Sequence, residues 1–484
     1  MNRILHGGLT LLAALVLLTV LALPAGASDK MDYVLDTDGS TKVYIPLTYT
    51  AQDVYAPTGA GGLNDPQDFC LGAPGTDYEK HMFIADTGNN RILILAPDGR
   101  FVREITEADG KPLLHPSGIT VDEDNDLYIS DTGNYRILHM TLEGQYIESF
   151  VKPESDMLDD AVFDVTRIAL SKGGLFYVMR GANFMMIDAQ NRFQGLVGST
   201  RVPYSLAFVF MRFFASQEQL EYYVSPEPPA YTSFTLGADG LLYATVEDTV
   251  DQIQIINGNG DNVYAKGFFG EKKINDDGSV LYPNFNDITV NKGGILSVLE
   301  KNSACIYQYD PQGNLLTVFG GRGDTKGFFT APVALVSTDD NELYVLDASR
   351  GDITRFSPTT FIQNVIEAAQ YYDNGLYDDA YDKWQEVYQT DAGYPLANEG
   401  IALALYKSGH LKDALDYYRL AESKGGYSDA YDDIRYAFFR QYFFGIVIAA
   451  AVLLVGAAFL IRWLYRLSGR YTREYFYGRE GKKR

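Results

Sequence analysis

Few residues of this sequence stand in a pattern that does catalytic chemistry on its own. The acidic run DEDND, Asp122–Asp126, begins like a calcium-binding loop, but its sixth position is not glycine and its twelfth is not glutamate, so we predict an acidic hairpin turn. The sequence has no G-x-S-x-G nucleophile motif and no phosphate-binding P-loop. Its two cysteines, Cys70 and Cys305, are two ordinary thiols or at most one disulfide bond. Motifs therefore identify no catalytic residue, no metal ligand and no cofactor.

The clearest pattern is a repeated phrase. ADTGNNRIL, Ala85–Leu93, and SDTGNYRIL, Ser130–Leu138, match at seven of nine positions and begin 45 residues apart. Each copy reads as a short strand, a polar turn and a second strand. Four further units have this form, at Leu175–Arg192, Leu241–Gly260, Leu296–Asn314 and Leu343–Pro358. Repeats of this length are typical of propellers and solenoids, and with one strand added at each end of every unit the sequence predicts six four-stranded blades.

These units resemble the NHL-repeat family of six-bladed β-propellers. The likeness lies in DTGNNRI, in DTGNYRI and in the connector FGGRGDTKGFFTAPVALV, Phe319–Val336. It implies an all-β propeller over residues 62–360, in which the RGD tripeptide is part of a connecting loop. The last unit lacks an outer strand, so we expect N-terminal strands within residues 28–61 to complete it and to close the ring without a free edge.

The repeated polar residues suit a structural role first. Asp86 and Asp131 end a strand and are placed to accept hydrogen bonds from the turn that follows, and Arg91 and Arg136 are placed to pair with them. We align the Asp86 position with Asp131, Arg180, Val246, Glu300 and Asp347. In this fold the turns between second and third strands share one face with the blade connectors, and ligands usually meet that face, here called the connector face. Its predicted binding residues are Asn90, Asn134, Tyr135, Arg180 and Arg350.

The resemblance also implies an enzymatic alternative. Propellers of this kind include gluconolactonase-type hydrolases, which hold a divalent metal with Glu, Asn and Asp side chains on inner strands. The hydrolase motifs are not recognisable here, but acidic or amide groups stand on the expected inner strands or their approaches, at Asp65, Asp68, Asn286 and Asp287. Related lyases need several histidine ligands, and of the five histidines only His115 lies near a channel-facing strand, so we expect no three-histidine zinc site.

An insertion interrupts the regular spacing. The step from Arg180 to Val246 is 66 residues, against 45 for the first step. The excess lies in residues 199–233, which are apolar and rich in aromatic side chains. Three interpretations stay open: a small local core packed on the propeller, a partner-docking surface, or a membrane contact.

After the propeller the periodicity becomes helical. The segments NGLYDDAYDKWQEVYQ and SGHLKDALDYYRLAES align 34 residues apart, which pairs Gly375 with Gly409, Ala380 with Ala414 and Trp384 with Tyr418. This pattern is similar to tetratricopeptide repeats, in which a small residue lets two helices approach and an aromatic ring fills the groove beside it. Residues 361–440 are therefore predicted to be helical, as a partner-binding module or as a rigid spacer.

Both ends of the chain carry membrane-targeting patterns. Residues 1–27 have the basic start, apolar run and small-residue cleavage site of a signal peptide. Residues 441–463 enclose the uncharged run Phe443–Ile461, whose helix of about 28 Å crosses a bilayer core of about 30 Å. From Arg462 to the C-terminus eight basic residues face two acids, so the tail, residues 464–484, is predicted to be cytoplasmic and the N-terminal domain extracytoplasmic.

Charge narrows the classes of partner. The formal net charge is −23, and because Arg3 and the segment from Arg462 onward contribute +7, the rest of the chain carries −30, which argues against nucleic acid. We predict a multidomain chain with an all-β six-bladed propeller, tetratricopeptide-like helical repeats and one C-terminal transmembrane helix. Its expected function, as a single-pass cell-membrane protein, is to bind or scaffold an integral-membrane or cell-surface protein, or a cell-surface carbohydrate. The alternative is a metal-dependent gluconolactonase-type hydrolase.

Overall fold

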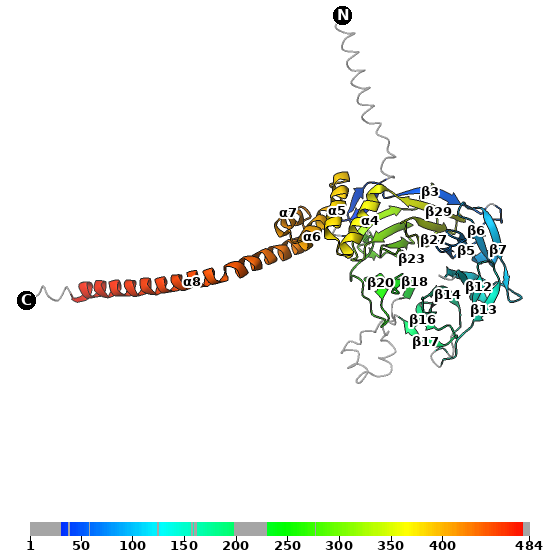
Figure 1. Cartoon of the computed structure of the whole chain (residues 1–484), viewed down its shortest axis with the longest axis horizontal. Helices are drawn as coiled ribbons and strands as arrows, with labels where there is room; N and C mark the ends of the chain where they lie inside the picture. Colours follow the sequence, from blue (N-terminus) through cyan, green and yellow to red (C-terminus); the bar gives the residue numbers. More distant parts are fainter. Residues whose placement is uncertain are drawn as a thin grey trace, which may run out of the picture. The chain divides into compact units, whose positions relative to one another are not determined.

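The computed structural model describes residues 31–36, 39–57, 59–122, 125–155, 158, 162–197, 230–275 and 277–477, with side chains up to residue 470 (Figure 1). The predicted signal peptide and most of the 199–233 insertion lie outside this described part. The chain forms two compact units, Met1–Ala397 and Asn398–Arg484. We describe each unit by itself.

The first unit is a six-bladed β-propeller, as predicted. Each blade is an antiparallel sheet whose strands follow one another in order from the innermost to the outermost. Figure 1 shows the blades arranged one after another round a ring. The first three blades are β4 (Asp68–Leu71), β5 (Met82–Asp86), β6 (Arg91–Leu95) and β7 (Phe101–Ile105); β10 (Pro116–Val121), β11 (Asp126–Asp131), β12 (Arg136–Thr141) and β13 (Tyr146–Phe150); and β14 (Val165–Leu170), β15 (Phe176–Arg180), β16 (Asn183–Ile187) and β17 (Phe193–Val197).

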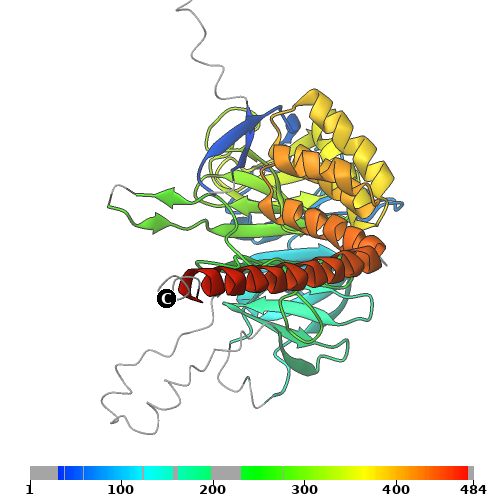
Figure 2. The ribbon, with the colours of Figure 1, turned by 90° about the vertical axis from the view of Figure 1, so that its left-hand side faces the viewer.

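The other three blades depart from the plain four-stranded form. Their strands are β18 (Ala230–Leu236), β19 (Leu242–Glu247) and β20 (Ile253–Ile256); β23 (Phe285–Val290), β24 (Leu296–Glu300), β25 (Cys305–Tyr309) and β26 (Leu315–Gly320); and β27 (Pro332–Ser337), β28 (Leu343–Asp347) and β29 (Asp352–Pro358). Among the described residues the fourth blade has three strands, not the four that the sequence suggested. In place of its outer strand the chain runs irregularly into the hairpin β21 (Lys273–Ile274) and β22 (Val280–Leu281), which projects from the ring in Figure 2.

N-terminal strands complete the fifth and sixth blades. β3 (Tyr49–Tyr55) pairs antiparallel with β29 and is the outer strand of the sixth blade, the place that the sequence analysis gave to the N-terminal strand. β1 (Asp32–Leu35) pairs with β26, and β2 (Lys42–Ile45) pairs with β1, so the fifth blade becomes six-stranded. First and last parts of the propeller are thus held in one sheet, which leaves no open edge at the join.

The hydrophobic core lies between neighbouring blades. Because each sheet is covered on both faces, its middle strands are almost continuously apolar, as in RILIL of β6, where all five residues are buried. Ile92 and Ile94 of the first blade pack against Ile119 and Leu138 of the second, for example. Burial on both sides explains why period-two alternation is faint in the sequence of these strands.

Two helices of the first unit lie against the propeller on the face opposite the blade connectors. α4 (Thr360–Asp373) meets turns of the fifth blade, where Gln312 Nε2 donates to Asp373 Oδ1 over 2.7 Å. α5 (Tyr377–Thr390) follows, and Tyr394 beyond it is fully buried and donates its hydroxyl to the Leu316 carbonyl over 2.9 Å. These contacts leave the connector face clear of both helices.

The second unit contains α6 (Pro395–Lys407) from Asn398 onward, α7 (Leu411–Leu420) and the 54-residue helix α8 (Lys424–Tyr477). Gly375 and Gly409 both have positive φ at the helix turns, and Ala380, Trp384, Ala414 and Tyr418 are all buried, so the residues aligned in the sequence have matching roles. The tetratricopeptide likeness itself remains a prediction. Within α8, the segment Lys424–Arg470 is long and apolar enough to cross a membrane.

Candidate functional site

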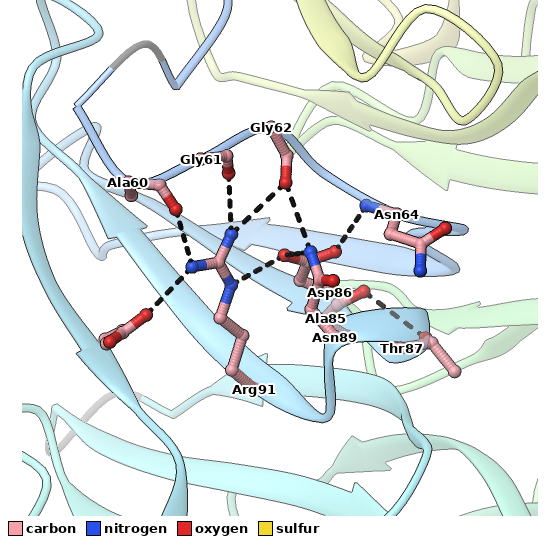
Figure 3. A network of polar contacts seen from close by, with 10 residues as sticks. Ala60, Gly61, Gly62, Asn64, Ala85, Asp86, Thr87, Asn89 and Arg91 are labelled. Atoms are coloured by element: carbon pink, nitrogen blue, oxygen red, sulfur yellow. Dashed lines mark hydrogen bonds and ion pairs between the residues drawn. The ribbon is translucent and has the colours of Figure 1, made fainter.

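The repeated phrase forms a clamp that ties each turn to a blade connector. In the first blade Asp86 is fully buried, and it accepts hydrogen bonds from the Asn64 backbone N–H (2.8 Å), Asn89 Nδ2 (2.8 Å) and Arg91 Nε (2.7 Å) (Figure 3). Arg91 then donates to three successive connector carbonyls, those of Ala60, Gly61 and Gly62. A charged guanidinium thus satisfies carbonyl groups that the connector cannot pair with itself.

The second blade repeats the carboxylate half of this clamp, whereas Arg136 donates to one connector carbonyl, that of Ala108, over 3.4 Å. Asp131 accepts from the Leu114 N–H, Asn134 Nδ2 and Arg136 Nε, each over 2.8 Å. The same turn also reaches the next blade, because the hydroxyl of Thr132 donates to the Val165 carbonyl over 2.6 Å. The structural interpretation of the repeated Asp and Arg residues is therefore confirmed in both blades.

The fifth and sixth blades keep the clamp with other residues. Glu300 of the fifth blade and Asp347 of the sixth accept connector N–H groups in the same way. Strand register places Val246 at the matching position of the fourth blade, as aligned in the sequence, since Tyr231 pairs with Val246 just before the bulge to Ser233, as Phe285 pairs with Glu300 just before the bulge to Asp287. Arg322 of the RGD tripeptide donates to the carbonyls of Lys301, Asn302 and Thr330, and so it is a loop-stabilising residue, as predicted.

Every blade has a left-handed residue at one position of its connector-face turn. These residues are Asn90, Tyr135, Gly181, Asp251, Ala304 and Gly351, with φ between 53° and 64°. Asn, Asp and Gly tolerate this conformation, whereas a bulky residue is strained there. Tyr135 is the single aromatic residue of the set, and 53% of it is exposed, whereas Ala304 is buried. The strained position therefore presents an exposed ring on the connector face.

The five predicted binding residues lie on the connector face but do not form one cluster. Asn90 accepts from the His115 N–H over 2.8 Å, and Asn134 Nδ2 binds the Pro112 carbonyl over 2.9 Å in addition to Asp131. Arg350 binds Asp352 and the Phe328 carbonyl. Arg180 donates to the Val162 carbonyl over 3.3 Å beside a shallow depression of about 300 Å³ in the third blade. Four of the five thus make internal contacts, and Tyr135 is the most exposed.

An ion-pair cluster joins inner strands across the middle of the ring. Asp68, Arg167, Ser233 and Asp287 occupy the same register position on the inner strands of blades one, three, four and five. Arg167 Nη1 lies 2.9 Å from Asp287 Oδ1 and 3.5 Å from Asp68 Oδ1. Ser233 donates to Asp287 over 2.7 Å. The cluster joins alternate blades through the middle of the ring.

Both carboxylates also accept inner-strand N–H groups of the next blade. Asp68 Oδ2 accepts from the Ile119 N–H over 3.1 Å, and Asp287 Oδ2 accepts from the Leu335 N–H over 2.6 Å. Burial raises the pKa of Asp68 to about 6, although Arg167 beside it acts in the opposite direction. Sequence reasoning named Asp68 and Asp287 but missed Arg167, because no local motif marks it.

This channel does not offer the donor set of a divalent metal. The carboxylates that were proposed as ligands already bind Arg167 and backbone N–H groups, and a guanidinium stands where a second cation would be repelled. Asp65 is exposed and accepts from Gln67 instead, and Asn286 binds the Pro332 carbonyl. Across the described residues no group of three or more His, Cys, Asp or Glu side chains is arranged to hold a metal.

Comparisons with known proteins agree with this architecture. A family model of the NHL repeat matches residues 113–140, which form most of the second blade. No curated protein sequence matches the chain. Similar solved structures include a streptogramin B lyase (12% identity, 64% of this chain and 98% of that chain, TM-score 0.40), virginiamycin B lyase from Staphylococcus aureus (14%, 68% and 88%, 0.38) and the WD40 β-propeller domain of Doa1 (11%, 65% and 98%, 0.39). At these scores the likenesses carry no functional argument, and the strand pairings and the matched repeat identify the chain as a six-bladed β-propeller containing an NHL repeat.

Proposed function

We propose that this chain is a membrane-anchored binding module whose connector face docks a protein partner outside the cytoplasm. The observation that carries the proposal is Tyr135, an exposed aromatic residue held in a left-handed conformation that costs a bulky side chain on the order of 1 kcal/mol or more. Strain of this kind concentrates at functional sites, and exposed tyrosines are enriched among the residues that dominate protein interfaces.

Two further apolar side chains stand beside Tyr135 at the connector end of the second blade. Leu114 is 40% exposed and lies over Gly133, whose N–H donates to the Leu114 carbonyl over 2.8 Å. Val151 is 51% exposed and directly follows β13, which pairs with β12 next to the turn. Together Leu114, Tyr135 and Val151 form what we call the blade-two patch.

The blade-two patch favours a protein over a carbohydrate. Binding of sugar hydroxyl groups needs side chains with unused hydrogen-bond donors and acceptors. The side-chain amides of Asn89 and Asn134 already donate to the clamp carboxylates, and Asn90 Oδ1 accepts from the His115 backbone N–H. What remains exposed in the blade-two patch is one aromatic ring and two aliphatic side chains, which suits an apolar side chain of a partner. The charge of −30 over residues 4–461 favours a partner with a basic surface around that side chain.

The anchor in this proposal is the apolar part of α8. We place the boundaries as the sequence suggests, with a signal peptide over residues 1–27, the propeller with its closing strands over 28–360, helices over 361–440, the membrane span over 441–463 and a cytoplasmic tail over 464–484. Basic residues that follow the span directly support this orientation. The hydrolase alternative is not proposed further, because Arg167 occupies the channel.

A photo-crosslinking amino acid at position 135 tests the docking face in intact membranes. Tyr146 is the matched control, since it is also an exposed tyrosine of the second blade but stands at the opposite end of β13. We expect a protein adduct from position 135 and none from position 146. Equal amounts of adduct from both positions, or an adduct with a glycan in place of a protein, would refute the assignment.

Orientation is tested with a membrane-impermeant thiol reagent. Burial raises the pKa of both native cysteines, Cys70 and Cys305, so their thiols react slowly. We expect Tyr146→Cys to be labelled on intact cells, and Ser468→Cys to be labelled only after the cells are permeabilised. The reverse pattern would place the propeller in the cytoplasm and end the proposal.

A further inference from the structure

The helical bundle of the second unit ends abruptly along α8. Its packed part is close: a Cβ at Gly426 would lie 2.2 Å from the Tyr418 ring, and Ala430 is fully buried. Tyr406 still reaches α8 at Asp433, where its hydroxyl donates to Oδ2 over 2.7 Å. Beyond this contact the side chains of α8 are exposed as far as Tyr465 and beyond, apart from Ile434. Only two or three turns therefore separate the bundle from the apolar run that starts at Phe443.

These turns have an unusual composition. Six of the nine residues from 436 to 444 are aromatic, in the sequence YAFFRQYFF. Their exposed fractions run from 47% for Phe439 to 80% for Phe444. No Asp or Glu occurs between Asp433 and Glu474. So much exposed aromatic surface is costly in water, and it needs a covering.

The aromatic side chains point to all sides of the helix. With about 3.6 residues per turn, positions 436, 439 and 443 lie on one side, 438 and 442 on another, and 444 between them. A single docked helix or domain would select one stripe, as on an amphipathic helix. A covering that is the same all round points to lipid. Tyrosine and similar amphipathic rings favour the headgroup layer of a bilayer.

We propose that residues 436–444 form an aromatic collar inserted in the outer headgroup layer, so that the α6–α7 bundle rests directly on the membrane surface. This inference rests on the proposed anchoring by α8. The seven residues 436–442 rise about 10 Å above the apolar run, compared with roughly 5 to 8 Å for one headgroup layer. The collar thus fills this layer and ends where the bundle begins.

The charges beside the collar fit phosphate-bearing lipids. Arg440 lies inside the collar, and a side chain of this kind can bury its aliphatic stem among apolar groups while its guanidinium reaches the lipid phosphates. Arg435, one turn above, is paired with Asp432 over 2.9 Å. At the other end Trp463 lies 21 residues beyond Tyr442, or about 32 Å along the helix, which matches the thickness of the hydrocarbon core.

Single-tryptophan reporters in the full chain test the collar. Both native tryptophans, Trp384 and Trp463, are replaced by Phe, and a tryptophan is introduced as Tyr431→Trp, Phe438→Trp or Val452→Trp. Each protein is reconstituted in phosphatidylcholine–phosphatidylglycerol vesicles that carry bromine either near the headgroup or near the chain ends. We expect the 438 reporter to be quenched more by shallow bromine, the 452 reporter more by deep bromine, and the 431 reporter by neither.

The three reporters separate failure of the collar from failure of the anchor. If the 452 reporter is quenched by deep bromine but the 438 reporter is as unquenched as the 431 control, the span stands and the collar is refuted. If the 452 reporter is not quenched either, the anchoring is wrong and the collar falls with it. Quenching of the 431 reporter by shallow bromine would place the bundle inside the headgroup layer and would also contradict the proposal.

Discussion

Replacing Arg167 by methionine removes the only cation of the channel cluster while keeping the length of the side chain. Two buried carboxylates, Asp68 and Asp287, then face each other without the guanidinium that bridges them at 3.5 Å and 2.9 Å. Loss of one partner of a buried ion pair typically costs about 3 to 5 kcal/mol. For a domain of this size roughly 2 °C corresponds to each kcal/mol, so the melting temperature should fall by about 6 to 10 °C at pH 7. Asp68 takes up a proton on acidification, so the loss should be smaller at pH 5.

The assay is calorimetric unfolding of the detergent-solubilised full chain at both pH values. Arg192→Met is the matched control, because Arg192 belongs to the same blade and pairs with Asp188 over 2.8 Å at the surface. Such exposed pairs contribute about 0 to 1 kcal/mol. Equal effects of the two substitutions, or an Arg167→Met loss that does not change with pH, would show that the cluster does not hold the channel together.

Three other outcomes follow from the contacts. Burial raises the pKa of Asp32 and of Asp68 to about 6, so the folded chain binds these two protons more tightly than the unfolded chain does. The free energy of unfolding should therefore rise from pH 7 to pH 5 by about 1 kcal/mol per group. Asp32→Asn and Asp68→Asn should flatten this pH dependence in calorimetric unfolding. Arg91→Lys loses the planar fork that binds three connector carbonyls, so hydrogen exchange should quicken in that connector and not in the fourth blade; uniform exchange would contradict the clamp. Gly133→Val places a Cβ 2.6 Å from the Leu114 side chain and 2.7 Å from its carbonyl oxygen, and should lower stability by about 1 to 3 kcal/mol in thermal unfolding, whereas an unchanged melting temperature would mean that this turn is loosely packed.

Local patterns were sufficient to predict the ring of blades. The copies of DTGN specify a strand end, a turn and a left-handed residue within a few positions, so Asp86 and Asp131 could be given their roles from the sequence. The closing strand could be inferred because the last unit lacked an outer strand. In the fourth blade these signals are weak, which is why the missing outer strand was not foreseen.

The channel cluster could not be predicted, because its members lie far apart in the sequence. Asp68, Arg167 and Asp287 are brought together only by closure of the ring and by bulges that shift the register of the inner strands. The same limit applies to the binding residues. Asn90 and Asn134 look free in the sequence, but the structure shows their amides bound to connectors. Exposure of Tyr135 at a strained position follows from the turn geometry, which only the coordinates reveal.

The most direct test of the docking face is the affinity of the crosslinked partner for three forms of the full chain: wild type, Tyr135→Ser and Tyr146→Ser. A dominant interface residue contributes about 2 kcal/mol or more, which corresponds to a loss of affinity of about thirtyfold. We predict that loss for Tyr135→Ser and less than a twofold change for Tyr146→Ser. If the partner binds wild type and Tyr135→Ser with equal affinity, it binds elsewhere on the chain, and the account is contradicted.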